Sequence, residues 1–435
     1  MTWRNWSRSQ RAEPSALHAP VTAADVQAVV REVRGRGGSL RAVGAGHSFS
    51  AAARPDDAQM TLDGLAGLLG VDGATGEATL LAGTRLREVP ALLAPSGLAM
   101  EVLGDIDAQT IAGAISTGTH GTGLAFGSIG STVTAATLVT GEGELLRVDA
   151  GSRPELLPAV RLGLGALGIL VDVTVRCVPA FGLDAVEAVV DLDPVLDDWR
   201  GLAERTDHFE LYWFPTTRVA VTKSNARVPL DDPSRPLRPR SAVGRFVDER
   251  ILTDLGHRAL LALGALAPAT RPGINALSAQ LMPRGRFSEP SHEVFSAPRT
   301  VRFREMEYGL PLDAVPAAMR EIDRALRRAD LAVTFPIEVR ATAADDAHLS
   351  TAHGRQSGYV AVHRWWREDP RPLFDLVEPI LLAHDGRPHW GKLHSLRAPE
   401  LATRFPGFEA FLAARDELDP RRTFGSAWTR RVLGD

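Results

Sequence analysis

The chain has 435 residues and a net charge of −4, with 44% hydrophobic and 23% charged residues. This composition is typical of a folded protein of two or three domains, and the charge gives no electrostatic reason to bind nucleic acid or an anionic membrane. The single cysteine, Cys177, excludes an internal disulfide and a cysteine-based metal site, and its apolar surroundings predict a small core residue.

The sequence does not predict targeting to a membrane. The N-terminal stretch lacks the apolar segment of a secretory signal, and the apolar run 260–269 is too short to cross a bilayer. We therefore expect a cytoplasmic protein without membrane insertion.

The first 180 residues predict alternating short strands and helices. Residues 21–38 form an amphipathic helix pattern, in which Thr22 and Asp25 make a capping box and valines line one face. After this helix we expect strands over 39–43 and 77–83 and a helix over 84–97 that is capped by Thr84. A hairpin is expected over 134–148, and a glycine-rich turn that leads into a strand over 161–178.

Beyond residue 180 the pattern changes to longer strands separated by helical segments. A helix is expected over 312–329, and the last 50 residues contain a further helix and a basic end. The Pro- and Arg-rich stretch 226–300 is not assigned. Strands are expected over residues 209–215, 301–311, 333–341 and 358–366. The whole chain is therefore predicted to be of the α+β class.

Three glycine-rich loops carry no acidic residue, at 42–50, 110–123 and 163–170. The first, "AVGAGHSFS", is not a dinucleotide fingerprint because Phe49 stands at the third glycine position, and no Gly-Lys-Ser/Thr string provides a Walker loop. Closely approaching backbone N–H groups can nevertheless hold an anion. Tight turns would explain any one loop, but the three together favour a long, diphosphate-containing ligand.

Three groups of side chains could carry chemistry. Glu338 and Arg340 are two residues apart on an expected strand, so they share one face, either toward a site or as a surface pair. His363, on another strand, could point into a site or be a satisfied core histidine. In "RPHWGKLH" a glycine indicates a turn, and Lys392 offers a positive charge or is merely solvated. Metal binding by the two histidines of this segment lacks a completing carboxylate or cysteine, so no metal site is predicted.

Several segments together resemble a known family. "VGAGHS", "GDIDAQTIAGAISTGTHGTG", "LGALGIL", "FPIEVR" and "RPHWGKLH" occur here in an order similar to that of FAD-dependent aldonolactone oxidases of the vanillyl-alcohol oxidase type. The bacterial D-arabinono-1,4-lactone oxidases and L-gulono-1,4-lactone dehydrogenases are the most similar members. The resemblance implies a two-domain fold: an FAD-binding domain (1–179), an α+β cap domain that covers the substrate (180–385), and a C-terminal segment that returns to their interface (386–435).

The resemblance also assigns residues to the cofactor. His47 falls on the position of the histidine that is bonded covalently to the 8α-methyl of the flavin in this family. The residues expected to bind FAD are Val43, Gly44, Ala45, Gly46, His47, Ser48, Gly104, Asp105, Gly113, Ser116, Thr117, Thr119, His120, Gly121, Gly168, Ile169, His389 and Lys392.

The activity that the resemblance implies is oxidation of a hydroxyl of an aldono-1,4-lactone by hydride transfer to flavin N5, with O₂ or another electron acceptor. Arg340 and Lys392 would stabilise negative charge, and Glu338 or His363 would take the hydroxyl proton. The alternatives are oxidation of an alditol such as xylitol or sorbitol, which would produce H₂O₂, and a non-redox protein that binds a nucleotide.

Overall fold

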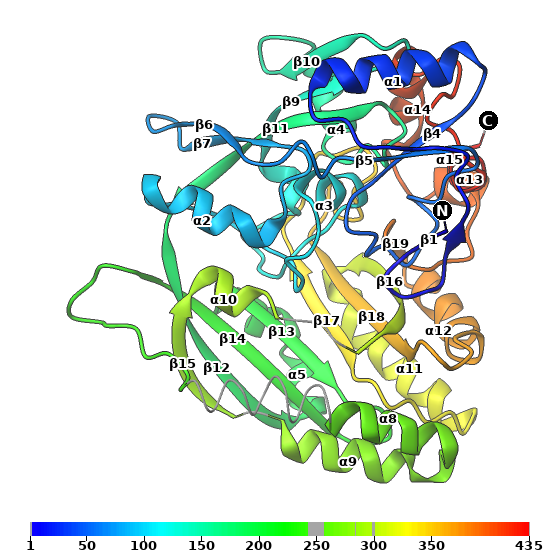
Figure 1. Cartoon of the computed structure of the whole chain (residues 1–435). Coiled ribbons are helices and arrows are strands. Elements are labelled where there is room, and N and C mark those ends of the chain that lie inside the picture. Colours follow the sequence, from blue (N-terminus) through cyan, green and yellow to red (C-terminus); the bar gives the residue numbers. More distant parts are fainter. Residues whose placement is uncertain (1, 242–255, 283, 298–300, 435) are drawn as a thin grey trace.

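The computed structural model describes residues 2–241, 256–282, 284–297 and 301–434. Two sheet-based halves follow one another along the chain, one in blue and cyan and one in green and yellow in Figure 1. The chain crosses from the first to the second at Ala180, between strands β11 (Ile169–Pro179) and β12 (Phe181–Asp191).

The first half contains an antiparallel sheet and a small parallel sheet. The antiparallel sheet runs β10-β9-β11-β7-β6, and β8 also pairs with β11. The parallel sheet has the order β3-β5-β4, and β1 pairs with β2. The bounds are Trp3–Arg4 (β1), Arg11–Ala12 (β2), Leu17–His18 (β3), Leu40–Val43 (β4), Ala58–Thr61 (β5), Leu68–Asp72 (β6), Glu77–Leu81 (β7), Leu98–Met100 (β8), Val133–Val139 (β9) and Leu145–Asp149 (β10).

Helix α1 (Ala23–Gly35) forms as its sequence predicts. Thr22 and Asp25 make the reciprocal capping box, and Val26, Val30 and Val33 are buried against the parallel sheet. The expected strands, the hairpin and the buried Cys177 of this half are also confirmed.

The cap expected at Thr84 is wrong. The Thr84 hydroxyl donates to the carbonyl of Leu81 and accepts from the N–H of Gly67, so it closes the turn after β7 instead. The helical segment begins later, as η1 (Leu86–Glu88), α2 (Val89–Leu93) and η2 (Ala94–Ser96).

The second half is an antiparallel sheet in the order β15-β12-β14-β13-β17-β18-β16-β19. The strands expected around 209–215, 301–311, 333–341 and 358–366 are confirmed as β13, β16, β17 and β18. The bounds are His208–Trp213 (β13), Val219–Pro229 (β14), Gly285–Pro290 (β15), Phe303–Pro311 (β16), Ile337–Thr342 (β17), Ser357–Trp365 (β18) and Arg387–Pro388 (β19).

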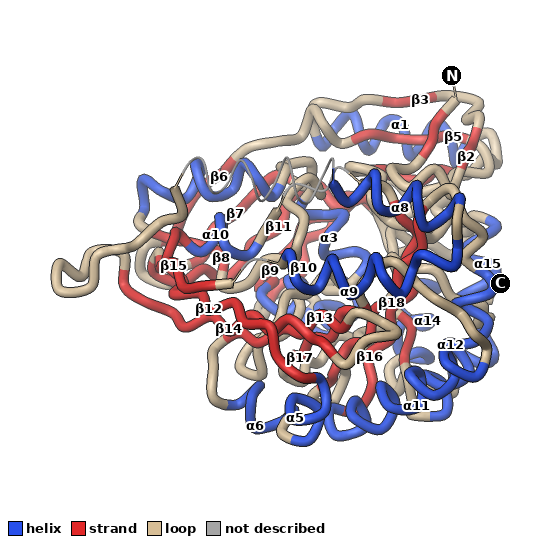
Figure 2. Tube along the Cα trace, turned by 90° about the horizontal axis from the view of Figure 1, so that it is seen from below, coloured by secondary structure: helices blue, strands red, loops and turns tan. Residues whose placement is uncertain are grey.

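The two faces of this sheet differ because side chains alternate along each strand. One face is apolar: Leu211, Ile337, Val339, Met306 and Val360 pack in one core with the helices below the sheet. Figure 2 shows these helices, α5, α6, α11 and α12, along one side of the strands. The central strands carry charged side chains on the opposite face, and the loops of the first half lie against it.

The helices of this half include α11, which the sequence predicts. The unassigned stretch 226–300 contains the end of β14, helices α8 to α10 and β15, and its residues 242–255, 283 and 298–300 lie outside the described residues. The bounds are Leu192–Asp197 (α5), Trp199–Glu204 (α6), His257–Leu266 (α8), Arg271–Leu281 (α9), Ser291–Phe295 (α10), Val315–Arg328 (α11) and Arg371–Ala383 (α12). In the part of the chain described, no helix is long and apolar enough to cross a membrane.

The last segment returns to the first half. Its helices pack into the core of the antiparallel sheet of that half, while β19 pairs with β16 of the other sheet. The N–H of Leu40 donates to the carbonyl of Thr423 (2.8 Å). The division of the chain at residues 179 and 385 stays a prediction. The helices are Ala398–Ala402 (α13), Phe408–Leu418 (α14) and Ala427–Leu433 (α15).

Candidate active site

The glycine-rich loops line one cleft of the first half, here called the glycine cleft. It encloses about 850 Å³, part of it open to solvent. Gly44 has no room for a side chain, because a Cβ there would collide with the hydroxyl of Thr110, and Gly46 has a φ of 66° that favours glycine. Thr110 caps helix α3 (Ile111–Thr117) by accepting from the N–H of Gly113 (3.1 Å). Backbone therefore forms much of the wall.

The described residues that line the glycine cleft include no carboxylate, and their charged member is Arg41. Its guanidinium is buried and donates to the carbonyl oxygens of Leu164, Gly165 and Phe424 at 2.8 to 2.9 Å, and also to that of Ala52. Burial lowers the pKa of Arg41 to about 10, which leaves it charged at neutral pH. The cleft therefore suits an anion.

A second and larger hollow, here called the cavity, lies between these loops and the charged face of the sheet. It encloses about 1270 Å³, part of it open to solvent. His47, Ser48, Gln109 and Thr117 line both hollows, so the cleft and the cavity adjoin at these residues.

Glu338 and Arg340 point into the cavity from β17, whereas Ile337 and Val339 point into the core. Arg340 forms ion pairs with Glu338 on its own strand, with Asp105 from a loop of the first half, and with Glu210 of β13 (3.2 Å). Arg340 is thus a bridge between the two halves, surrounded by carboxylates.

A second cation, Lys392, lies in the turn after β19 between two carboxylates of β16. Its ammonium is 2.5 Å from Glu305 Oε2 and 3.7 Å from Glu307 Oε2. Burial works to raise the pKa of Glu305, but Lys392 and His363 outweigh it and lower this pKa to about 2. Burial likewise opposes the charge of Lys392, yet the two glutamates raise its pKa. Burial also works to raise the pKa of Glu307, but His120 and Lys392 lower it well below its usual value. Glu305, Glu307 and Lys392 are therefore charged at neutral pH.

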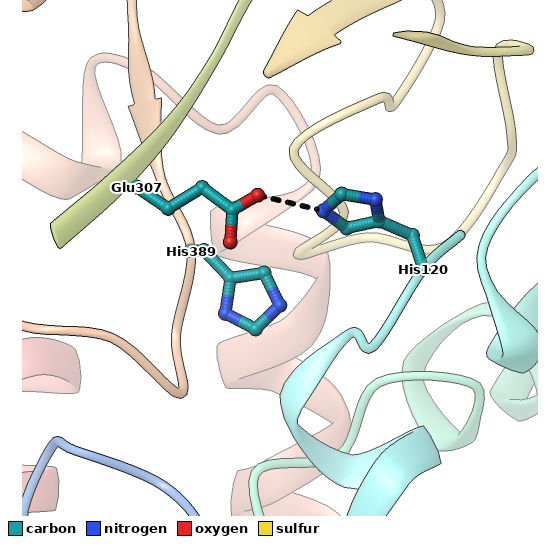
Figure 3. Close-up of side chains that lie close together, drawn as sticks. All are labelled: His120, Glu307 and His389. Atoms are coloured by element: carbon teal, nitrogen blue, oxygen red, sulfur yellow. Dashed lines mark ion pairs between the residues drawn. The ribbon is translucent and has the colours of Figure 1, made fainter. Parts of the chain in front are cut away.

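Three histidines surround this group. His120 Nε2 lies 3.3 Å from Glu307 Oε1, and His363 Nε2 lies 3.5 Å from Glu305 Oε1. Figure 3 shows the Glu307 carboxylate between the rings of His120 and His389. Burial lowers the pKa of His389 to about 4, so this ring is neutral.

His47 stands where the two hollows adjoin. Its ring stacks on Trp6 with centroids 5.2 Å apart. Burial lowers the pKa of His47 to about 4, and the nearby charges of Arg85 and Lys392 act in the same direction. The imidazole is therefore neutral, with a nitrogen lone pair available.

The structure brings the sequence-predicted residues together with one exception. Glu338, Arg340, Lys392 and His363 all line the cavity. Of the predicted FAD-binding residues, Gly121 lines neither hollow, although its carbonyl accepts from His120 Nδ1 (2.9 Å). Those in the glycine cleft are Val43, Gly44, Ala45, Gly46, His47, Ser48, Gly113, Ser116, Thr117, Gly168 and Ile169. Those in the cavity are Gly104, Asp105, Thr119, His120, His389 and Lys392, besides His47, Ser48 and Thr117 again.

Three ionisable residues that line the cavity were not predicted from the sequence: Tyr212, Glu305 and Glu307. Glu210, which pairs with Arg340 from β13, was not predicted either. Their signal was present, since both pairs stand two residues apart on expected strands, as Glu338 and Arg340 do. In "FREMEYGL" the two glutamates stand at alternate positions, on the strand face opposite to Met306 and Tyr308, and this pattern indicates a charged face.

The glycine cleft fits FAD. Its backbone walls admit a close-fitting ligand, its lack of carboxylates favours a diphosphate, and it leads into a cavity of reactive side chains. The fold and this pair of hollows define a flavoprotein oxidoreductase. The family description "FAD binding domain" matches residues 14–149, and "D-arabinono-1,4-lactone oxidase" matches residues 173–432. The chain belongs to the D-arabinono-1,4-lactone oxidase family, and FAD is its cofactor.

Full-length relatives agree with this family. The chain is 37% identical over 432 residues to an L-gulono-1,4-lactone dehydrogenase of Mycobacterium tuberculosis, covering 99% of both chains. It is 30% identical to the L-gulonolactone oxidase of Bos taurus, covering 99% of this chain and 98% of the other.

Solved structures show the same fold at low identity. Cholesterol oxidase from Brevibacterium sterolicum superposes with a TM-score of 0.81 at 15% identity, covering 99% of this chain and 96% of the other. The predicted fold class, a two-domain α+β fold of the vanillyl-alcohol oxidase type, is confirmed.

Proposed function

We propose that the protein oxidises a hydroxyl of an aldono-1,4-lactone of the D-arabinono- or L-gulono-1,4-lactone type. The observation that carries the proposal is the convergence of Glu338, Arg340, His363 and Lys392 in a cavity that adjoins the glycine cleft. The family description and the names of the full-length relatives support the lactone as substrate.

FAD, when bound, accepts the carbon-bound hydrogen of the substrate together with two electrons, as a hydride. The chain must take the hydroxyl proton and stabilise the negative charge that develops on the substrate oxygen. Among the described residues that line the cavity, Arg340 and Lys392 are the cations placed to do so, and their ion pairs fix them before the substrate enters. Glu338 or His363 takes the proton.

His47 carries the flavin as a covalent tether in this proposal. Its position between cleft and cavity, and its neutral ring, suit a bond from a ring nitrogen to the flavin 8α-methyl. After acid denaturation and gel electrophoresis, flavin fluorescence is expected to stay with the polypeptide. In His47→Ala the flavin should separate from the chain. Complete separation in the unmodified protein would rule out the tether.

The acceptor is O₂ or another oxidant, and the site of action is the cytoplasm. One experiment tests substrate and acceptor together: anaerobic addition of aldono-1,4-lactones and alditols, followed by air. The lactones should bleach the flavin absorbance at micromolar to millimolar concentration. Bleaching by xylitol or sorbitol alone would assign the protein as an alditol oxidase. Recovery of colour with H₂O₂ in air would identify O₂ as the acceptor.

A further inference from the structure

His363 makes two contacts that fix its protons. Its Nδ1 lies 3.1 Å from the carbonyl oxygen of Pro336, and its Nε2 lies 3.5 Å from Glu305 Oε1. A carbonyl oxygen accepts hydrogen bonds and cannot donate, so Nδ1 carries a proton. A carboxylate likewise only accepts, so the approach of Nε2 is attractive only if this nitrogen carries a second proton.

His120 repeats the pattern on the other side of Lys392. Its Nδ1 lies 2.9 Å from the carbonyl oxygen of Gly121, and its Nε2 lies 3.3 Å from Glu307 Oε1. The same reasoning gives both nitrogens a proton. The groups form a chain of alternating charge, which runs His363, Glu305, Lys392, Glu307, His120.

Two other buried histidines show what a neutral ring looks like here. His208 Nδ1 donates to the carbonyl of Thr122 (2.6 Å), while its Nε2 accepts from Arg227 Nε (3.2 Å). His389 Nδ1 accepts from the N–H of Gly391 (3.0 Å), so a neutral His389 carries its proton on Nε2. The rings differ because a donor faces one nitrogen in each neutral case, whereas the polar contacts of His363 and His120 with the described residues are all with acceptors.

The same geometry speaks against a metal ion at this point. His120, Glu307 and His389 place one possible ligand atom each within 4.8 Å of the others (Figure 3). However, the Nδ1 lone pair of His389 is used by Gly391, and its Nε2 carries the proton of the neutral ring. His389 therefore has no lone pair left for a metal.

We infer that Glu305 and Glu307 are positioning residues that keep His363 and His120 doubly protonated and hold Lys392 between them. Both N–H groups of His363 are then engaged, by Pro336 and by Glu305, so the ring has no lone pair with which to take a proton, and Glu338 is left as the proton acceptor. This inference rests on the proposed function for the identity of the reaction, but the protonation of the two rings does not depend on it.

The groups that face these rings come from several elements. Glu305 of β16 and the aromatic rings of Phe303 and Phe335 surround His363, with Lys392 beyond Glu305. Glu307 of β16, His389 after β19, and Tyr359 of β18 surround His120; the Tyr359 ring stacks on it at 3.6 Å. Among the described residues, Glu305 and Glu307 are the negatively charged groups in direct contact with these rings.

Nitrogen-15 NMR of histidine-labelled holoenzyme at pH 7.5 tests the inference without any substrate. His363→Asn and His120→Asn assign the signals, and His208 and His389 provide internal references for the two neutral forms. Both nitrogens of His363 and of His120 should show the protonated shift. A bare-nitrogen signal from either ring would overturn the inference.

Variants of the glutamates test the positioning role. In Glu305→Gln the Nε2 signal of His363 should move to that of a bare nitrogen, and Glu305→Asp should restore the protonated signal. Anaerobic flavin reduction by a lactone should fall by about 10² in Glu305→Gln, because Lys392 loses the carboxylate that positions it, and the effect should lie mainly in the limiting rate rather than in KM. FAD content verifies folding.

A matched control lies outside the cavity, where His384 Nε2 pairs with Glu321 Oε2 (2.9 Å); Glu321→Gln should leave the rate unchanged. The acid limb of the pH–rate profile should persist in His363→Asn and disappear in Glu338→Gln. The reverse result would restore His363 as the base. If no lactone reduces the flavin but both rings are doubly protonated, the proposed substrate is wrong and the assignment of protons stands.

Discussion

The glycine cleft and the cavity share four residues, yet they are built by opposite means. The cleft presents backbone and glycines, and its charged residue Arg41 is held by carbonyl oxygens. The cavity presents side chains in ion pairs, with Arg340 and Lys392 each between carboxylates. A cofactor that stays bound needs a fixed shape, whereas a reaction that moves a proton and a hydride needs charges that are already in place.

The largest effect is expected from placing a charge in the cleft. Gly46→Asp sets a carboxylate beside the diphosphate, at a position whose φ of 66° favours glycine. At about 4 Å and an effective dielectric near 20 the repulsion is roughly 4 kcal/mol, or about 10³ in affinity. Flavin absorbance per chain should collapse, whereas Gly73→Asp, at an exposed turn with open space around it, should keep it. Full occupancy in Gly46→Asp would place the diphosphate elsewhere.

Removing a cavity charge should slow chemistry and spare the cofactor. Arg340→Leu takes away the cation that faces three carboxylates, and losing one preorganised donor typically lowers rates by about 10² to 10³, or about 3 to 4 kcal/mol. Stopped-flow reduction should slow by that factor with FAD retained, and Lys392→Met should behave alike. Arg371→Leu, which breaks an exposed pair with Asp369, is the matched control. Near-normal rates in both cavity variants would remove these residues from the site.

A smaller effect is expected from His394, two residues after Lys392, on the pH dependence of stability. Burial, with help from Arg431, lowers the pKa of His394 to about 3, and both its ring nitrogens lack a partner in the described structure. In the unfolded chain the His394 side chain binds a proton below about pH 6.5, whereas in the folded chain it does so only below about pH 3. The contribution of His394 to stability is therefore complete above pH 6.5 and is lost as the pH falls.

At pH 5 this loss is about 2 kcal/mol relative to pH 7.5. His394→Phe keeps a ring and removes the titration. Between pH 7.5 and pH 5 the unfolding free energy of this variant, measured in urea, should therefore fall by about 2 kcal/mol less than that of the unmodified protein. An identical pH dependence in both proteins would show that the His394 side chain is accessible to water in the folded protein.

The smallest effect should come from a substitution at the boundary between the glycine cleft and the cavity. Gln109 lines both hollows and donates to Thr119 Oγ1 (3.0 Å). Gln109→Ala removes one neutral hydrogen bond, which is worth about 1 kcal/mol. KM and FAD retention should each change by about fivefold or less. A loss as large as that of Gly46→Asp or Arg340→Leu would show that the two hollows are one site.

The sequence predicted the elements whose causes are local. Helix α1 follows from a capping box and a valine stripe, and the shared face of Glu338 and Arg340 follows from strand period. The cap at Thr84 failed because a tertiary partner, Gly67, competes for the hydroxyl.

What the sequence left open depends on distant partners. Arg340 meets Asp105 across 235 positions of the chain, and no spacing rule reveals such a pair. The position of Lys392 between Glu305 and Glu307 likewise requires β16 and the turn after β19 to lie side by side. The sequence could have indicated both glutamates, but not which cation they hold.

The return of the C-terminal segment has a consequence for biosynthesis. Arg41, directly before the first glycine loop, donates to the carbonyl of Phe424, a residue 383 positions later, and Leu40 donates to Thr423. At roughly 5 to 20 residues per second a ribosome needs roughly 20 to 80 s to make the intervening chain. The nascent protein therefore spends this time with an unfinished loop, and we expect flavin to load only after release from the ribosome.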